Sequence, residues 1–191
     1  MRNKKPASRN IGVDLDKNCL EAWPKSTNIS LELVNSRAED FLKSYTFRGD
    51  ELVYVDPPYL PSTRRRERIY RHEYTESDHQ DLLSLLVKLP CNVLISGYDS
   101  HLYNDVLSGW NRQSFTAKTH TDVRTETVWF NYAQPTRLHD SQHLGHTFRD
   151  RERVRRKLNR LKGKFEEMDP LVRSALLDWL SDRFPREGVP P

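Results

Sequence analysis

The sequence contains little cysteine and little glycine, and it has no long apolar run. Its two cysteines, Cys19 and Cys91, are too few for the disulfide framework of a small secreted domain, and we expect both to be reduced thiols in the core. No stretch is long and apolar enough to span a membrane, and no apolar segment follows the basic N-terminal residues as it would in a signal peptide. The glycines are scattered singly, so there is no glycine-rich turn. These absences favour a cytoplasmic protein.

Composition and charge are those of an α/β protein with one main domain. Hydrophobic residues make up 36% of the 191 residues and charged residues 30%, which allows a sizeable core in a chain of this length. The formal net charge is +4, a mildly basic value that is compatible with a polyanionic partner. The charge alone does not identify that partner.

The most informative segment is Asp56-Pro57-Pro58-Tyr59, because it directly follows an apolar run. Residues 51–55 are rich in β-branched and aromatic side chains and predict a buried parallel strand. The two prolines fix φ and lack an N–H, so the turn is stiff and its carbonyls are left unpaired. A carboxylate, a free carbonyl and an aromatic ring at a strand end suit the binding of a planar base through its amino group.

The residues after this motif form an ordered series of predicted elements. A capped helix, a strand ending in Gly97 and Tyr98, a short helix and two further strands, the last preceded by Arg124 and Glu126, are expected over residues 75–89, 92–96, 102–107, 112–117 and 127–132. Together with the Asp-Pro-Pro-Tyr motif, this order resembles the later half of phage-type and prophage-type DNA adenine methylases. The resemblance covers about residues 9–133.

The resemblance implies a Rossmann-like S-adenosylmethionine-dependent methyltransferase fold and a reaction on double-stranded DNA. The methyl group of S-adenosylmethionine would move to the exocyclic amine of an adenine flipped out of the helix. Asp56 and the Pro57 carbonyl would each accept one N–H of that amine, Pro58 would stiffen the turn, and Tyr59 would stack on the base. Methylation of a cytosine amine is a close variant, although such relatives more often begin the motif with serine.

Two upstream strands, predicted over residues 10–16 and 30–34, supply the candidates for cofactor binding. An acid at the end of the second strand of a nucleoside-binding α/β fold typically holds ribose hydroxyls, and Asp14 and Asp16 both fit that position. The resemblance places recognition of the cofactor's adenine after the next strand. Asp40 and Phe41 are the candidates there, and Glu39 is equally well spaced.

An arginine-rich loop follows the motif and contains the candidates for DNA binding. Its arginines would hold phosphates beside the target nucleotide, and its tyrosines would shape the pocket. The alternative is a mobile loop whose charges serve only solubility. The candidate residues are Arg64, Arg65, Arg66, Arg68, Tyr70 and Arg71.

The sequence departs from the family's pattern at its beginning. These enzymes carry a Lys- and Gly-rich segment and a first strand that ends in a glycine turn, whereas this sequence begins a few residues before the second strand. In the family's strand order the missing strand lies mid-sheet, so its loss leaves two unpaired edges. We therefore expect a fragment, a wrongly started reading frame, a half completed in trans by a polypeptide that supplies the strand, or a non-catalytic DNA-binding remnant.

Beyond the predicted catalytic domain, residues 1–133, the sequence predicts a linker, a helical hairpin and a disordered tail over residues 134–147, 148–184 and 185–191. His139, His143 and His146 fall in the linker, where no cysteine or catalytic glutamate accompanies them, so no metal site is predicted. The first hairpin helix is strongly basic. We expect its charges to face water, with DNA contact as the alternative.

Overall fold

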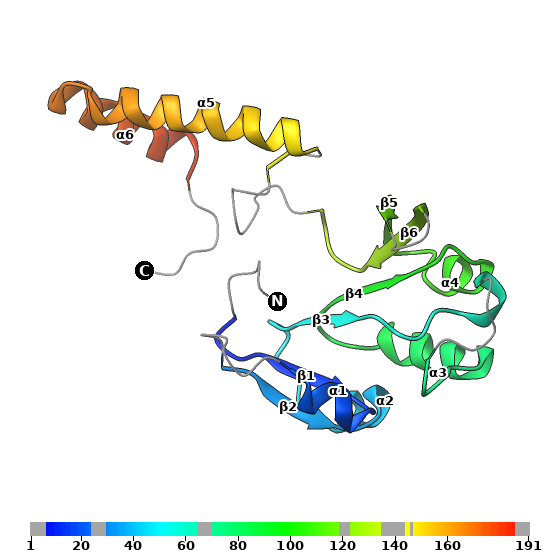
Figure 1. Ribbon diagram of the computed structural model, residues 1–191. Helices are drawn as coiled ribbons and strands as arrows, with labels where there is room; N and C mark the ends of the chain where they lie inside the picture. Colours follow the sequence, from blue (N-terminus) through cyan, green and yellow to red (C-terminus); the bar gives the residue numbers. More distant parts are fainter. Residues whose placement is uncertain are drawn as a thin grey trace. The chain divides into compact units, whose positions relative to one another are not determined.

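A computed structural model describes residues 7–23, 30–64, 70–118, 123–134, 144–145 and 147–185. The chain divides into two compact units, Met1–Pro135 and Thr136–Pro191. The first unit mixes strands and helices, and the second contains two helices (Figure 1). None of the helices in the described ranges is long and apolar enough to cross a membrane.

The first unit has the mixed α/β architecture that the sequence predicts. Its strands and helices alternate along most of the chain, as expected for a methyltransferase fold (Figure 1). The strands are β1 (Ile11–Asp14), β2 (Glu32–Asn35), β3 (Leu52–Val55), β4 (Asn92–Gly97), β5 (Asn111–Lys118) and β6 (Val123–Phe130). The helices are α1 (Lys17–Glu21), α2 (Ala38–Ser44), the 3₁₀ turn η1 (Pro61–Thr63), α3 (Glu76–Leu86) and α4 (His101–Val106).

The strands form two separate sheets. β1 and β2 pair in parallel, and the other four strands follow the order β3-β4-β6-β5, in which β3 and β4 are parallel and β6 is antiparallel to both of its neighbours. Within the described ranges no strand joins the sheets, so β1 and β3 each keep an unpaired edge. This separation lies where the sequence predicts a missing central strand.

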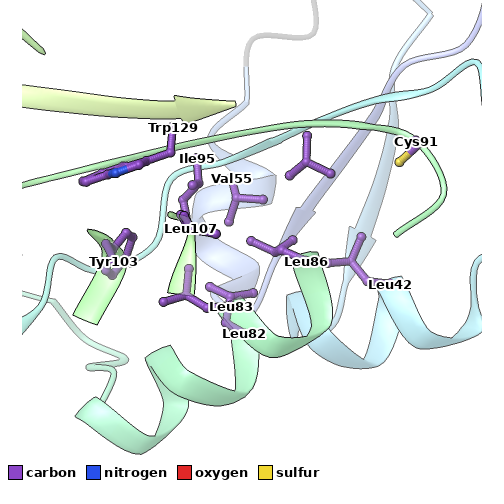
Figure 2. Close-up of a cluster of buried hydrophobic side chains, with 11 residues drawn as sticks. Leu42, Val55, Leu82, Leu83, Leu86, Cys91, Ile95, Tyr103, Leu107 and Trp129 are labelled. Carbon is purple, nitrogen blue, oxygen red and sulfur yellow. The ribbon is translucent and has the colours of Figure 1, made fainter. Parts of the chain in front are cut away.

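Helix α3 covers one face of the four-stranded sheet and builds the core. Thr75 and Asp78 form a capping box at its N-terminus, as the sequence predicts for this helix start. Three of its four leucines are almost fully buried and point toward strand residues such as Val55 and Ile95 (Figure 2). Burying each such side chain stabilises the fold by about 1.5–3 kcal/mol. The three leucines are Leu82, Leu83 and Leu86.

Strand β3 is parallel to β4, as predicted, but the prediction that it is buried is wrong for one of its faces. Val53 and Val55 contribute to the core under α3, whereas Leu52 is 61% exposed and Tyr54 is 56% exposed. Successive side chains of a strand point to opposite faces. The face of β3 that carries Leu52 and Tyr54 is therefore open in the described residues.

Two further predictions differ from the structure or lie beyond it. Cys91 is a buried core thiol, but Cys19 is exposed in α1, because that short helix has no buried residue. Both cysteines are free, as predicted. The linker histidines, together with residues 186–191, lie outside the described residues.

The second unit consists of α5 (Phe148–Glu166) and α6 (Pro170–Arg183). Thr147 and Asp150 form a capping box at the start of α5. The Asp169 carboxylate accepts hydrogen bonds from the backbone N–H groups of Leu171 and Val172 and so caps α6, whose first residue is the predicted Pro170. Neither helix has a fully buried residue.

Candidate active site

Asp56 lies at the carboxyl end of β3, directly after Val55, and its side chain is exposed. The Ser96 hydroxyl donates a hydrogen bond of 2.9 Å to its Oδ1 atom. Ser96 lies on β4, at the position that follows the register pair Val55 and Ile95. The Oδ2 atom has no partner among the described residues. The site therefore fixes one oxygen of the carboxylate and presents the other.

Ser96 also connects Asp56 to Tyr54. Ser96 is only 4% exposed, and its Oγ atom lies 3.1 Å from the Tyr54 hydroxyl. A carboxylate oxygen and a carbonyl oxygen can only accept hydrogen bonds. The single hydroxyl proton of Ser96 is therefore donated to Asp56 or to the more distant Val55 carbonyl at 3.4 Å. Tyr54 is then the donor in its bond to Ser96. The three side chains form a relay that ends on the exposed carboxylate.

The remainder of the motif forms a stiff turn and places the Tyr59 ring against Tyr98; we call these two rings the aromatic wall. Pro57 is buried, and no described residue donates a hydrogen bond to its carbonyl. Tyr59 is half-buried and meets Tyr98 edge to face, with 4.5 Å between ring centroids. Burial, followed by the negative charge of Asp56, raises the pKa of the Tyr59 hydroxyl, so this group stays protonated.

A third strand supports the aromatic wall. The Arg124 guanidinium lies 5.4 Å from the centroid of the Tyr98 ring, and its Nη1 atom donates to the Tyr98 hydroxyl at 3.3 Å. Arg124 is at the start of β6, which is antiparallel to β4 and therefore begins where β4 ends. The ends of β3 and β4 and the beginning of β6 thus meet at one edge of the sheet.

The start of the arginine-rich loop is held by a buried ion pair. Arg64 donates two hydrogen bonds to the Glu73 carboxylate, of 3.1 and 2.7 Å, and its side chain is only 2% exposed. Glu73 also accepts from the backbone N–H of Tyr70, whose ring lies 5.4 Å from the Arg64 guanidinium. Arg64 therefore does not present its charge to solvent. Arg65, Arg66 and Arg68 lie outside the described residues.

Arg71, the last arginine of the loop, reaches the end of β1. It pairs with the Asp16 carboxylate at 2.9 Å, and Asp16 also caps α1 through the backbone N–H of Asn18. Asp14 is exposed, and its Oδ1 atom accepts from the Asp16 backbone N–H at 2.7 Å. Of the two acids that the sequence leaves open, Asp16 is committed to protein contacts and Asp14 is the accessible one.

The first turn of α2 separates the three candidates for adenine recognition. Asp40 is exposed, whereas Glu39 is 6% exposed and its Oε2 atom lies 3.5 Å from Nε of Arg37. Phe41 is half-buried against the core. Burial, followed by the neighbouring Glu39 carboxylate, raises the pKa of Tyr74. Glu39 therefore faces the protein, and Asp40 faces solvent.

The sequence-based prediction of the site omitted Ser96, Tyr98 and Arg124. The signal was present, because Ser96 and Tyr98 flank a glycine at the end of a predicted strand and Arg124 precedes the last strand of the domain. Parallel strands share their carboxyl edge, and an antiparallel strand starts there. A prediction that places the ends of β3 and β4 and the start of β6 at one edge of the sheet would therefore place these side chains near Asp56.

A family model described as D12 class N6 adenine-specific DNA methyltransferase matches residues 9–125, more than half of the chain. The chain belongs to this family. The match includes Asp56, Ser96 and Arg124, which the structure brings to one edge of the sheet. The members of this family are DNA adenine-N6 methyltransferases, so DNA is the substrate class. Helices α5 and α6 of this D12-class protein lie outside the match, and no curated protein matched the chain.

Proposed function

We propose that this chain supplies the catalytic site for methyl transfer from S-adenosylmethionine to the exocyclic amine of an adenine flipped out of double-stranded DNA. The observation that carries the proposal is the state of Asp56, which is exposed, anchored by Ser96 through Oδ1, and unpartnered among the described residues at Oδ2. A structural ion pair would have left this carboxylate committed elsewhere.

The contacts around Asp56 suit an aromatic amine. The nitrogen lone pair of adenine is delocalised into the ring, which makes the amine a poor nucleophile. Asp56 Oδ2 and the Pro57 carbonyl would each accept one N–H, which draws the nitrogen toward tetrahedral geometry and localises its lone pair. Tyr59 would stack on the base with about 1–3 kcal/mol, and Tyr98 holds the Tyr59 ring in place.

The described residues also fit the nucleoside end of S-adenosylmethionine. Ribose hydroxyls and an adenine amine are donors, and Asp14 and Asp40 are exposed carboxylates at the end of β1 and in the first turn of α2. We assign the ribose to Asp14 and the adenine to Asp40, beside Phe41. When bound, S-adenosylmethionine would supply the methyl group: the amine nitrogen would bond to the methyl carbon as the carbon–sulfur bond breaks. S-adenosylhomocysteine would leave, and the methylated amine would lose one proton to solvent.

A second polypeptide segment is part of the proposal. β1 and β3 each expose a strand edge, and unpaired N–H and C=O groups on such edges bind a further strand readily. We infer that a strand parallel to β3 completes the sheet between β1 and β3. A DNA-binding protein without catalysis is the alternative if no such strand is supplied.

Catalysis is tested with radiolabelled S-adenosylmethionine and duplex DNA. Asp56→Asn keeps the shape of the side chain but replaces one acceptor oxygen with a donor, so methyl incorporation should fall by at least 100-fold, in line with about 2.7 kcal/mol of lost transition-state stabilisation. Asp99→Asn is the matched control, since Asp99 follows β4 but pairs with Arg112. Equal rates for the wild-type protein and Asp56→Asn would refute the assignment of Asp56.

The strand is tested by hydrogen–deuterium exchange of the purified chain. Alone, the amides of β1 and β3 that face away from their partners should exchange much faster than those of β4, which is paired on both sides. Strong protection of β1 and β3 in the purified monomer would contradict the inference. Calorimetry with S-adenosylmethionine on the same sample shows whether the cofactor binds before the sheet is completed.

A further inference from the structure

The charges of α5 are concentrated on one surface of the second unit. This helix contains nine Lys or Arg residues and three acids, a surplus of six positive charges in 19 residues. The surplus exceeds the net charge of +4 for the whole chain, so the remainder of the protein is slightly acidic. The basic character of the protein therefore resides in α5.

Part of this charge forms a continuous stripe. Four arginines recur at spacings of four, three and four residues, which places them on one face of an α-helix, and Lys157 flanks them. The opposite face carries Val154, Leu158 and Phe165, which are half-buried. We call the five cations the α5 stripe: Arg149, Arg153, Arg156, Lys157 and Arg160.

Within the described residues, most of the α5 stripe is not neutralised by carboxylates. Arg153 pairs with Asp150 and remains 79% exposed at its side chain, while the other four members are exposed and form no ion pair with any described residue. In the first unit, by contrast, Arg37, Arg64 and Arg71 are each paired with a carboxylate. Like charges at these spacings destabilise a helix by about 0.2–0.5 kcal/mol per pair, and an anionic partner would relieve that repulsion.

We propose that the α5 stripe binds the phosphate backbone of duplex DNA. The choice of DNA rests on the proposed function, since the chain belongs to a family that acts on DNA. Arginine forms bidentate hydrogen bonds with phosphate, and four of the five stripe residues are arginine. From residue 149 to residue 160 the stripe extends about 16 Å at about 1.5 Å per residue, a length that meets several phosphates along one groove.

The geometry favours DNA over an anionic membrane. A helix that lies on a bilayer inserts its apolar face into the lipid and places its cations along the rim of that face. In α5 the stripe instead lies opposite the apolar residues, of which Leu158 and Phe165 are already half-buried. The cations therefore point away from any surface that the apolar face would enter. Contacts to phosphate carry no sequence information, so the stripe contributes affinity and not site choice.

The test measures binding of the full chain to labelled duplex DNA by fluorescence anisotropy over a series of salt concentrations. The variant R149Q/R156Q/R160Q removes three stripe charges, and the matched control R155Q/K162Q/R183Q removes three exposed charges from other faces of α5 and from α6. Glutamine is a good helix former, so both variants should keep their helicity by circular dichroism. The stripe variant should lose affinity roughly tenfold or more at low salt, and its salt slope should fall by about 3.

Three results would overturn the proposal. The first is wild-type affinity in the stripe variant. The second is equal weakening of both variants, which would reduce the effect to bulk charge. The third result comes from vesicles that contain phosphatidylserine: loss of vesicle binding with retained duplex binding would assign the stripe to a membrane. Methyl transfer separates this proposal from the previous one, because a chain that lacks transfer but binds DNA through the stripe would contradict only the catalytic assignment.

Discussion

Ser96 holds Asp56 by a hydrogen bond that crosses from β4 to β3, 40 residues away along the chain. The bond depends on the parallel register that pairs Val55 with Ile95, because the next residue on each strand is then Asp56 and Ser96. A shift of one residue would turn Ser96 to the other face of the sheet. The pairing of two strands thus sets the direction of the carboxylate, and Ser96 acts as a positioning residue.

Removing the Ser96 hydroxyl should slow methyl transfer while the protein remains folded. A hydrogen bond to a charged group is worth about 1.5–3 kcal/mol, so Ser96→Ala should lower kcat by roughly 10- to 100-fold. The matched control is Ser114→Ala, which removes a hydroxyl that contacts Thr127 at 2.9 Å on the neighbouring strand pair. Single-turnover methylation of duplex DNA measures both. An unchanged rate for Ser96→Ala would show that Asp56 is oriented without it.

The hydrogen bonds around Ser96 predict that Tyr54 acts on Asp56 through Ser96. Tyr54→Phe removes the hydroxyl 3.1 Å from Ser96 Oγ and should cost about 0.5–1.5 kcal/mol, a fall in rate of up to roughly tenfold. In a Ser96→Ala background the same change should have a smaller effect on the rate, because the contact between Tyr54 and Ser96 is already gone. If the losses in rate are additive in the double variant, Tyr54 acts by a route other than Ser96, such as a contact made by its exposed ring.

The ion pair between Arg64 and Glu73 should stabilise the protein far more than an exposed pair does. Glu73→Gln leaves the guanidinium of Arg64 buried without a carboxylate and should cost on the order of 3 kcal/mol of the free energy of unfolding. The comparison is Asp99→Asn, which breaks an exposed pair with Arg112 and should cost less than about 1 kcal/mol. Urea unfolding followed by tryptophan fluorescence measures both. Equal costs would show that the burial of Arg64 is unimportant.

The sequence predicts those features that depend on local patterns. Helix α3 is foreseen from its cap at Thr75 and its leucines, and the turn after β3 is foreseen from its two prolines. The burial of Arg64 could not be predicted, because a run of arginines in a sequence does not show which of them are solvated and which are buried. Its partner Glu73 is nine residues away across a loop.

The other features that the sequence did not predict depend on contacts between segments that are distant along the chain. The bond from Ser96 to Asp56 requires the strand register, which no local pattern specifies. The exposure of Leu52 could not be read because β3 is apolar on both faces, and burial then depends on which neighbours are present. β6 begins at Val123, four residues before the predicted strand, because a hydrophobic pattern does not detect the polar residues Arg124, Thr125 and Glu126.

His79 gives the fold a pH dependence of its own. The ring is fully buried in α3, its Nδ1 atom is 2.9 Å from the Tyr103 hydroxyl, and its Nε2 atom has no partner among the described residues. Burial lowers the pKa of His79 to about 4 from the ordinary value of 6.5. Asp78 opposes the shift, and Arg64 adds to it. The neutral imidazole is therefore the form that the core accepts.

This burial should make the protein less stable as the pH falls from 6.5 toward 4. In that interval the unfolded chain binds a proton at His79 and the folded chain does not, so protonation favours unfolding, by up to about 3 kcal/mol once both pKa values are passed. His79→Gln removes the titrating group, and its free energy of unfolding should vary less over this interval. Urea unfolding at a series of pH values measures the free energy of unfolding of both proteins. Taking the difference between the two removes the contribution of the carboxylates that they share. Parallel curves for the two proteins would mean that the pKa of His79 is the same in the folded and the unfolded chain, which would contradict the shift that its burial predicts.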